Sequence, residues 1–239
     1  MPRPPSPSPN LSESLKVASW NLQIFGQTKA NNSQLMNQYV KTIQDYDLIF
    51  IQEIRDSSGE AFPKLCAMLL NYSCEISSRA GRTVSKEQYG VIYKKQIKLN
   101  FLKDYNPDPQ DRWERPPLEV SFDLGTYNLT LINIHIKPQE VKEELDYLED
   151  LIPNQGNTAV LGDLNADCAY YNPKTSQAFD TWIWLIQDNQ DTTVGSSDCA
   201  YDRIFVTPTL NQKVFAKGID TRVTPEESDH YLIWFQVQT

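Results

Sequence analysis

The chain has 239 residues, of which 40% are hydrophobic and 11% aromatic, so it is long enough to bury a sizeable core. No apolar run approaches the roughly 20 residues that a bilayer-spanning helix needs, which excludes a transmembrane class. The balance of 22 basic against 31 acidic residues gives a net charge of −9. This charge disfavours passive nucleic-acid binding through a basic surface, but it is compatible with an acidic site filled by divalent cations.

The cysteines and the first residues bound the organisation of the chain. Four cysteines occur without a CxxC spacing, which argues against a zinc site. An even number suits two disulfides in an oxidising compartment, and isolated buried thiols are the alternative. Residues 1–14 are rich in proline and serine, so we expect a disordered lead there and one domain over residues 15–239. No apolar signal segment follows Met1, so an exported form would be a mature chain.

Strand-like and helix-like segments alternate from residue 15 onward. Helices are expected over residues 35–43 with Ser33 as N-cap, near 60–70, over 141–152 and near 175–186. Buried or alternating runs predict strands at 15–20, 47–51, 72–78, 89–94, 97–102, 117–123, 128–136, 158–161, 201–206, 213–217 and 231–237. Hairpins mixed with β-α-β segments predict an α+β fold with mixed α/β layers, not a doubly wound sheet.

The residues that end these apolar runs are the most informative feature of the sequence. For any one of them, a polar residue that starts a turn is the simpler interpretation. Six cases together indicate a site, because functional groups of sheet proteins collect outside strand ends. The set comprises Asn21, Glu53, His135, Asp163 with Asn165, Asp202, and Asp229 with His230.

The chemistry of this set points to phosphodiester hydrolysis. Both histidines of the chain, His135 and His230, belong to it, and imidazole can take and give a proton near neutral pH. The remaining members carry carboxylate or amide oxygens, which suit Mg²⁺, Mn²⁺ or Ca²⁺ better than zinc. Acid and base groups beside such a cation can activate water and stabilise the charge that develops on phosphate.

Five strings resemble the endonuclease/exonuclease/phosphatase superfamily, and within it the deoxyribonuclease I-like proteins. They are VASWNLQIFG (17–26), IQEIRD (51–56), LGDLNADC (161–168), CAYDRI (199–204) and SDH (228–230). The GDxN and SDH signals are shared across the superfamily, whereas ADC and CAYDR are narrower. The resemblance runs from about residue 15 to the C-terminus, and it implies a four-layer sandwich of two packed mixed β-sheets flanked by helices.

The resemblance also implies the roles of the site residues. Asn21, Glu53 and Asp229 would hold a catalytic Mg²⁺ or Mn²⁺, while Asp163 and Asn165 would bind the phosphate or a second ion. His135 paired with Glu87 would be the general acid. His230 paired with Asp202 would help to generate the nucleophilic water. The implied activity is endonucleolytic hydrolysis of DNA to 5′-phosphate and 3′-hydroxyl ends.

Substrate contacts and structural features are implied in the same way. The residues expected to contact double-stranded DNA are Arg55, Arg82, Arg115 and Tyr170. Asp191 and Thr193 would begin a structural Ca²⁺ loop that Gly195 and Ser197 continue. Cys168 and Cys199 would form a disulfide worth roughly 3–4 kcal/mol, and this pairing favours a secreted or extracytoplasmic protein. We expect a monomer without membrane contact.

Departures from the family pattern leave alternatives open. Ser85 stands where the family places a groove-inserting tyrosine. Cys66 and Cys74 have no counterpart and either form a private disulfide or remain thiols. The acidic residues of the loop at 104–114 either bind calcium or are simply solvated; they are Asp104, Asp108 and Asp111. The competing functions are a phosphodiesterase of lipids or small phosphate esters and a non-enzymatic protein-binding role.

Overall fold

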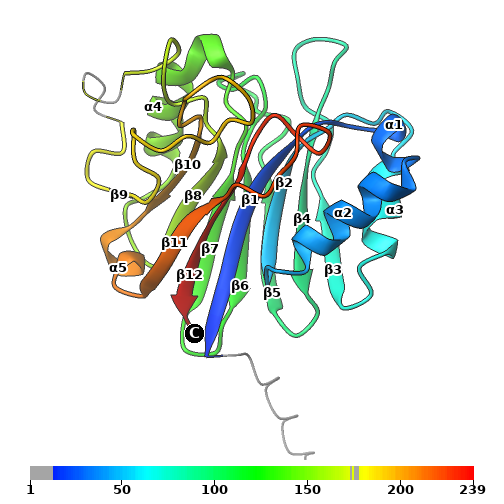
Figure 1. Cartoon of the computed structure of the whole chain (residues 1–239). Helices are drawn as coiled ribbons and strands as arrows, with labels where there is room; N and C mark the ends of the chain where they lie inside the picture. Colours follow the sequence, from blue (N-terminus) through cyan, green and yellow to red (C-terminus); the bar gives the residue numbers. More distant parts are fainter. Residues whose placement is uncertain (1–12, 173, 175–177) are drawn as a thin grey trace, which may run out of the picture.

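The computed structural model describes residues 13–172, 174 and 178–239, in which two six-stranded sheets pack face to face (Figure 1). The first sheet has the order β11-β12-β1-β2-β4-β3 and the second the order β5-β6-β7-β8-β10-β9. The strands are β1 Ser14–Phe25, β2 Leu48–Ile54, β3 Tyr72–Ile76, β4 Gln88–Lys94, β5 Lys98–Asp104, β6 Leu118–Asp123, β7 Asn128–Asn133, β8 Thr158–Asp163, β9 Ile183–Trp184, β10 Asp202–Val206, β11 Val214–Asp220 and β12 Leu232–Gln238.

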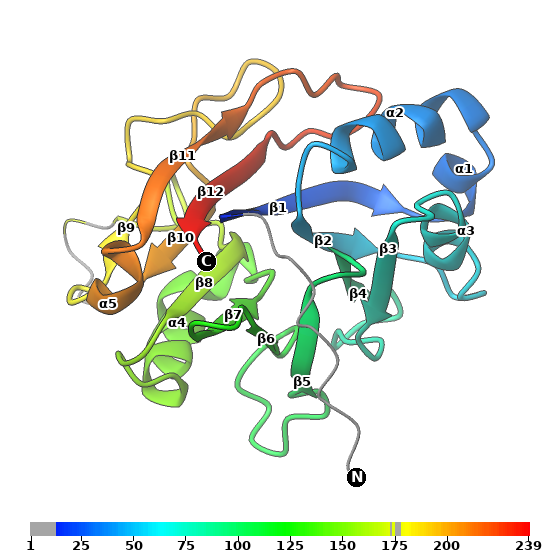
Figure 2. The same ribbon diagram turned by 90° about the horizontal axis from the view of Figure 1, so that it is seen from below.

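Helices cover the outer faces of both sheets, which gives four layers (Figure 2). The first sheet carries α1 (Gln27–Ala30), α2 (Ser33–Ile43) and α3 (Ala61–Ala67), and the second carries α4 (Val141–Leu151), which follows the short 3₁₀ helix η1 (Pro138–Glu140). The remaining helix, α5 (Pro208–Asn211), links β10 to β11. No helix of the described residues is long and apolar enough to cross a membrane.

Three apolar clusters follow from the alternation of side chains along the strands. One fills the space between the sheets, and each of the others joins the outer face of a sheet to its helices. Strands β7 and β8 contribute to two clusters because successive residues point to opposite faces: Leu131 packs between the sheets and Ile132 packs against α4. The predicted α+β fold with two packed mixed sheets is therefore confirmed.

Three sequence predictions about local structure were wrong. The N-cap of α2 is Asn32, whose side chain accepts a hydrogen bond from Leu35 N, and Ser33 is the first helical residue. Residue 14, assigned to the lead, already pairs with Gln238 in β1, whereas residues 1–12 lie outside the described part. The helix near 175–186 does not form over 178–186, and its other positions, 175–177, lie outside the described residues.

A short edge strand replaces that helix because its aromatic residues have a sheet to pack on. Trp184 pairs with Phe205 across β9 and β10, and their ring centroids are 4.1 Å apart. Leu185 N donates to Ile204 O at 2.8 Å. Burial against β10 thus overrides any local helical preference of this segment.

Candidate active site

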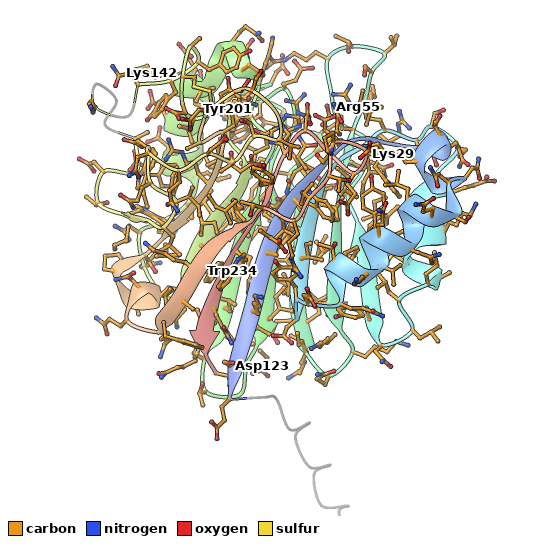
Figure 3. The ribbon with its side chains drawn as sticks, viewed as in Figure 1. Lys29, Arg55, Asp123, Lys142, Tyr201 and Trp234 are labelled. Carbon is orange, nitrogen blue, oxygen red and sulfur yellow. A yellow bond between two sulfur atoms is a disulfide. The ribbon has the colours of Figure 1, made fainter. Side chains whose placement is uncertain are left out.

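The polar strand-terminal residues meet because of how the strands are oriented. Within each sheet, β1 is parallel to β2 and β7 is parallel to β8, so four strands end at one edge of the sandwich. The antiparallel strands β10, β12 and β4 begin at that same edge. Figure 3 labels Arg55 and Lys29 at this edge and Asp123 at the opposite one. The topology therefore gathers side chains from seven strand ends.

The first cluster is built around His135 and Glu87. His135 Nδ1 lies 2.8 Å from Glu87 Oε2, and both side chains are buried. Burial raises the pKa of Glu87, but His135, Arg115 and Arg55 outweigh it and lower the pKa to about 2. Because Glu87 is ionised, the imidazole of His135 keeps a proton on Nδ1, and its Nε2 faces the site.

The second cluster repeats this arrangement with His230 and Asp202. His230 Nδ1 lies 2.7 Å from Asp202 Oδ2, and burial raises the pKa of Asp202 to about 6 against the opposing effect of His230. Burial would lower the pKa of His230, but Asp202, Asp163 and Asp229 together raise it well above 6.5. The charged groups that act on this pair are therefore carboxylates, whereas arginines flank the carboxylate of the first cluster.

One carboxylate oxygen connects the two clusters. Asp163 Oδ2 lies 3.3 Å from His135 Nε2 and 3.6 Å from His230 Nε2. The same oxygen accepts a hydrogen bond from Asn21 Nδ2 at 2.9 Å, and that amide nitrogen also lies 3.1 Å from Glu53 Oε1. Two carboxylates thus converge on a single neutral amide, and both histidine clusters have the composition and spacing to hold a metal ion.

Three residues at this edge of the sandwich adopt positive φ angles. Glu53 and Asn165 adopt positive φ angles of 59° and 49°, a conformation that costs a non-glycine residue about 1–3 kcal/mol. Gly162 has φ 151°, and a Cβ at that position would stand 2.0 Å from Ile134 O. Only glycine allows β8 to approach β7 this closely just before Asp163.

The other predicted ion ligands lie beside the clusters and not within them. Asn165 Nδ2 donates to Ile136 O at 2.9 Å, and its backbone N lies 3.2 Å from Asp163 Oδ1. The Asp229 side chain is 52% exposed, and its Oδ1 lies 3.8 Å from His230 Nε2. Asp229 is therefore free to reach solvent and substrate, whereas Asn165 is fixed to the backbone.

Two of the predicted DNA-contacting arginines flank Glu87. Arg55 Nη2 lies 2.8 Å from Glu87 Oε1 and 3.3 Å from Glu53 Oε2. Arg115 Nη1 lies 3.3 Å from Glu87 Oε1, and its Nε donates to His135 O at 3.0 Å. The Arg55 side chain is 28% exposed and that of Arg115 only 11%, so Arg55 is the more accessible cation.

The other two predicted contacts stand apart from the clusters. Arg82 is bound to Asp111 and Glu140, each at 3.0 Å, with Glu114 at 3.8 Å. Two of the acidic residues in the loop at 104–114 form ion pairs, Asp111 with Arg82 and Asp108 with Arg112. Tyr170 is 41% exposed and leans on Tyr201 with ring centroids 5.6 Å apart.

All four cysteines are paired. Cys168 bonds to Cys199 as predicted, and Cys66 bonds to Cys74, which decides the open alternative in favour of a second disulfide. The first bridge closes the loop that carries Asp191. Asp191 Oδ1 accepts hydrogen bonds from Thr193 N at 2.8 Å and from Thr193 Oγ1 at 2.6 Å. Thr193 in turn forms a β-bridge with His230, so this loop supports the second cluster.

Two side chains that brace the site were missed from the sequence. Lys29 Nζ donates to Leu22 O at 2.7 Å and Glu227 O at 2.9 Å, which ties the ends of β1 and the 227–230 segment together. Arg203 is fully buried and donates to Ile186 O and Ala166 O. Arg203 follows Asp202 directly, and an arginine inside the apolar run 203–206 was the available signal.

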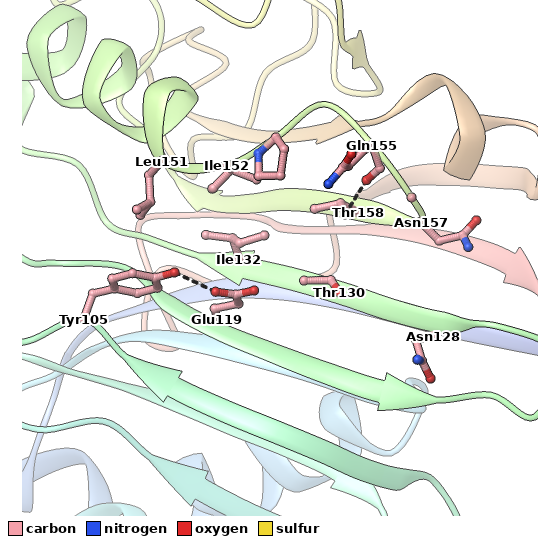
Figure 4. Close-up of a pocket in the computed structure, with 12 residues that line it drawn as sticks. Tyr105, Glu119, Asn128, Thr130, Ile132, Leu151, Ile152, Gln155, Asn157 and Thr158 are labelled. Carbon is pink, nitrogen blue, oxygen red and sulfur yellow. Dashed lines mark hydrogen bonds between the residues drawn. The ribbon is translucent and has the colours of Figure 1, made fainter.

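A pocket of about 580 Å³ lies at the other end of the same strands (Figure 4). Asn128 and Thr158, the first residues of β7 and β8, line it together with the end of α4. Tyr105 donates to Glu119 Oε2 at 2.7 Å within it. Neither histidine lines this pocket, so the candidate chemistry belongs to the opposite edge.

Comparisons with known proteins show the family to which the chain belongs. A model of the endonuclease/exonuclease/phosphatase family matches residues 18–230. The chain is similar to deoxyribonuclease gamma of Homo sapiens, 31% identical over 264 residues that cover 94% of this chain and 86% of that protein. It is also similar to deoxyribonuclease-1 of Sus scrofa, 31% identical with 92% and 90% covered, and to deoxyribonuclease-1-like 2 of Mus musculus, 33% identical with 80% and 76% covered.

Solved structures share the fold at low identity. An endonuclease/exonuclease/phosphatase family protein from Leptotrichia buccalis superposes with a TM-score of 0.69 at 16% identity, covering 94% of this chain and 100% of that one. A D. rerio TDP2 complexed with a single-strand DNA product superposes with a TM-score of 0.66 at 15% identity, covering 95% and 100%. At these identities the likeness establishes the two-sheet fold alone.

Proposed function

The chain is a deoxyribonuclease I-like member of the endonuclease/exonuclease/phosphatase family, and from this premise we propose that it is a divalent-metal-dependent endonuclease of DNA. The observation that carries the proposal is the position of Asp163 Oδ2, within 3.3 and 3.6 Å of the Nε2 atoms of two histidines. Each histidine is held from behind by its own carboxylate. Such a pair of oriented imidazoles suits a reaction that removes one proton and delivers another.

The donor set fits a divalent cation. Asn21, Glu53 and Asp163 offer amide and carboxylate oxygens, and the two carboxylates are drawn together at one amide nitrogen despite their like charge. When bound by these residues, with Asn165 and the exposed Asp229 beside them, Mg²⁺ or Mn²⁺ would stabilise charge on the phosphate and offset the carboxylate field around His230.

The protein groups then divide the proton transfers between them. His230, oriented by Asp202, takes a proton from the attacking water. His135, oriented by Glu87, donates a proton to the leaving 3′-oxygen, which gives 5′-phosphate and 3′-hydroxyl ends. Arg55 and Arg115, held on Glu87, present positive charge to the phosphate backbone of the substrate, which we propose to be duplex DNA. Arg82 and the exposed Tyr170 would contact the flanking DNA.

Cleavage of supercoiled plasmid tests this function. With Mg²⁺ the protein should produce nicked and then linear plasmid, and DNA ligase should reseal the nicks because it requires 5′-phosphate and 3′-hydroxyl ends. Asp163→Asn should abolish cleavage. Asp123→Asn, at a partly exposed residue at the other end of the second sheet, should leave it unchanged. Hydrolysis of sphingomyelin vesicles or of a small phosphodiester without any cleavage of DNA would contradict the proposal.

We also propose that the protein works in an oxidising, extracytoplasmic compartment as a monomer. Both disulfides support the oxidising compartment, because such bonds persist outside reducing compartments. Thiol labelling of protein taken from its natural compartment should modify no cysteine before reduction. Labelling of all four cysteines would contradict the assignment.

A further inference from the structure

Glu144 is a fully buried carboxylate on the apolar face of α4. It shares that face with Val141 and Leu148, which pack on the second sheet. Glu144 Oε1 accepts a hydrogen bond from Glu114 N at 2.8 Å and Oε2 accepts one from Lys137 N at 3.3 Å. Burying a carboxylate costs several kcal/mol unless it is well paired, so its presence here calls for a role beyond packing.

The two amides that Glu144 holds lie on either side of the His135 cluster. Glu114 immediately precedes Arg115, and Lys137 follows His135 by two residues. The indole N–H of Trp113 donates to Glu144 O at 3.0 Å, which fixes the same segment to α4 a second time. Glu144 therefore binds both of the chain segments that meet at the Arg115–His135 contact.

That contact leads directly to the reacting groups. Arg115 Nε donates to His135 O at 3.0 Å, and Arg115 Nη1 reaches Glu87 Oε1 at 3.3 Å. Tyr89 completes the link, because its hydroxyl donates to Arg115 O and accepts from His135 N, each at 3.0 Å. Any shift of segment 113–115 relative to segment 135–137 would move His135 against Glu87.

We propose that Glu144 is a positioning residue that keeps Arg115 and His135 in register by binding the backbone amides of Glu114 and Lys137. The proposal rests on the function assigned above, in which His135 delivers a proton. A displacement of about 1 Å in a reacting group can cost on the order of 100-fold in rate. Burial raises the pKa of Glu144 to about 7, which agrees with a carboxylate kept dry by the segments it holds.

Glu144→Gln tests the proposal, because the glutamine NH₂ would face a backbone N–H that needs an acceptor. The variant should lower kcat about tenfold or more with little change in KM. The matched control is Glu149→Gln on the same helix. Glu149 Oε1 accepts from Phe179 N at 2.8 Å, a comparable bond that leads away from His135. Glu149 is partly exposed, and its variant should keep the wild-type kcat.

A second readout does not depend on DNA cleavage. The chain has only two histidines, so the imidazole resonances of His230 are an internal reference for those of His135. At fixed pH, Glu144→Gln should shift the His135 resonances and leave His230 in place, and Glu149→Gln should shift neither. This result would stand even if the enzyme proved to act on another substrate, which separates the two proposals.

Two outcomes would overturn the positioning role. One is a Glu144→Gln protein with wild-type kcat. The other is an equal loss of kcat in Glu144→Gln and Glu149→Gln, or equal shifts at both histidines, which would mark a purely structural effect. If Glu144→Gln does not fold, Glu144→Asp keeps the charge and shortens its reach by one methylene, and the same readouts and criteria apply.

Discussion

The two histidine clusters have one design but different electrostatic surroundings. Glu87 stands between His135 and the guanidinium groups of Arg55 and Arg115, and these three groups lower its pKa to about 2. Asp202 has His230 as its partner, and burial raises its pKa to about 6. The first carboxylate is therefore ionised at every working pH, whereas the second shares a proton with its histidine.

The difference between the pKa values of Glu87 and Asp202 suits a site in which one histidine acts as an acid and the other as a base. Glu87, paired with two arginines, stays ionised and orients the imidazole of His135 through Nδ1. Asp202 has no arginine beside it, so it and the neighbouring carboxylates raise the pKa of His230. A bound divalent cation would oppose that effect. Environments that separate the proton affinities of two like groups are the usual way to divide such roles.

Replacing Asp163, which contacts both histidine clusters, should have the largest effect on cleavage. Asp163→Ala removes the carboxylate that faces both histidines and one of the oxygen donors for the cation. We expect plasmid cleavage to fall by about 10⁴-fold or more, because a proton-transfer group alone accounts for about 10²–10⁴-fold. Initial rates of nicking at saturating Mg²⁺ measure this. Residual activity above one-tenth of wild type would contradict the shared role.

Replacing one histidine at a time should separate the two halves. His135→Ala and His230→Ala should each lower kcat by about 10²–10⁴-fold on ordinary DNA. A substrate with sulfur in place of the leaving 3′-oxygen needs little protonation of its leaving group. It should restore most of the activity of His135→Ala and none of that of His230→Ala. The opposite pattern of rescue would exchange the two roles.

The carboxylate partners should differ in their effect on stability against pH. The pKa of Glu87 falls from 4.5 to about 2 on folding, which stabilises the fold by about 3 kcal/mol above pH 4.5. This contribution is lost as the pH falls through 2, and roughly half remains at pH 3. Glu87→Gln should therefore destabilise the protein more at pH 7 than at pH 3, as measured by urea denaturation.

Asp202→Asn is the control for that experiment. In the wild-type protein, folding raises the pKa of Asp202 from 3.8 to about 6, so folding disfavours the ionised carboxylate. The contribution of Asp202 to the free energy of unfolding therefore declines as the pH rises from 3.8 toward 6. Asp202→Asn should therefore not reproduce the acid dependence of Glu87→Gln. Parallel pH curves for the two variants would contradict the contrast between the clusters.

The two disulfides should contribute unequally to stability and to activity. The Cys168–Cys199 bridge closes a loop with a sequence separation of 31, against 8 for Cys66–Cys74, so its loss should cost about 4 kcal/mol compared with about 2.5 kcal/mol. Only the first bridge belongs to the loop that pairs with His230. Serine pairs at each bridge should show this order in thermal denaturation, and only loss of Cys168–Cys199 should lower kcat.

Calcium removal should give the smallest effect, confined to the His230 half. We expect Ca²⁺ at the loop of Asp191 and Thr193 to raise the melting temperature by a few degrees, as binding to the folded state alone would do. EGTA in the presence of Mg²⁺ should abolish this gain, and Asp191→Ala should be insensitive to either addition. A melting temperature independent of Ca²⁺ in the wild-type protein would exclude the structural calcium site.

The pattern of amino acids along the chain was enough to predict most of the strands and the chemistry at their ends. Alternating or continuous apolar runs specify period-two side-chain placement, so β8 and β12 could be predicted within one or two residues. The motifs around Asp163 and His230 were sufficient to indicate the family, and the pairing of Cys168 with Cys199 followed from that resemblance. These are local signals, since each depends on residues that are neighbours in the chain.

Which distant groups meet depends instead on how the sheets and helices pack. The sequence singled out Arg82 as a DNA contact, and the structure adds three carboxylates around it, two from the loop at 104–114 and one from Glu140. The helix expected near 175–186 yields to an edge strand because β10 offers an aromatic surface. The sequence analysis did not single out Glu144, yet two backbone amides 23 residues apart converge on its carboxylate. Burial and hydrogen-bond partners of this kind depend on how the sheets and helices pack, which no local pattern encodes.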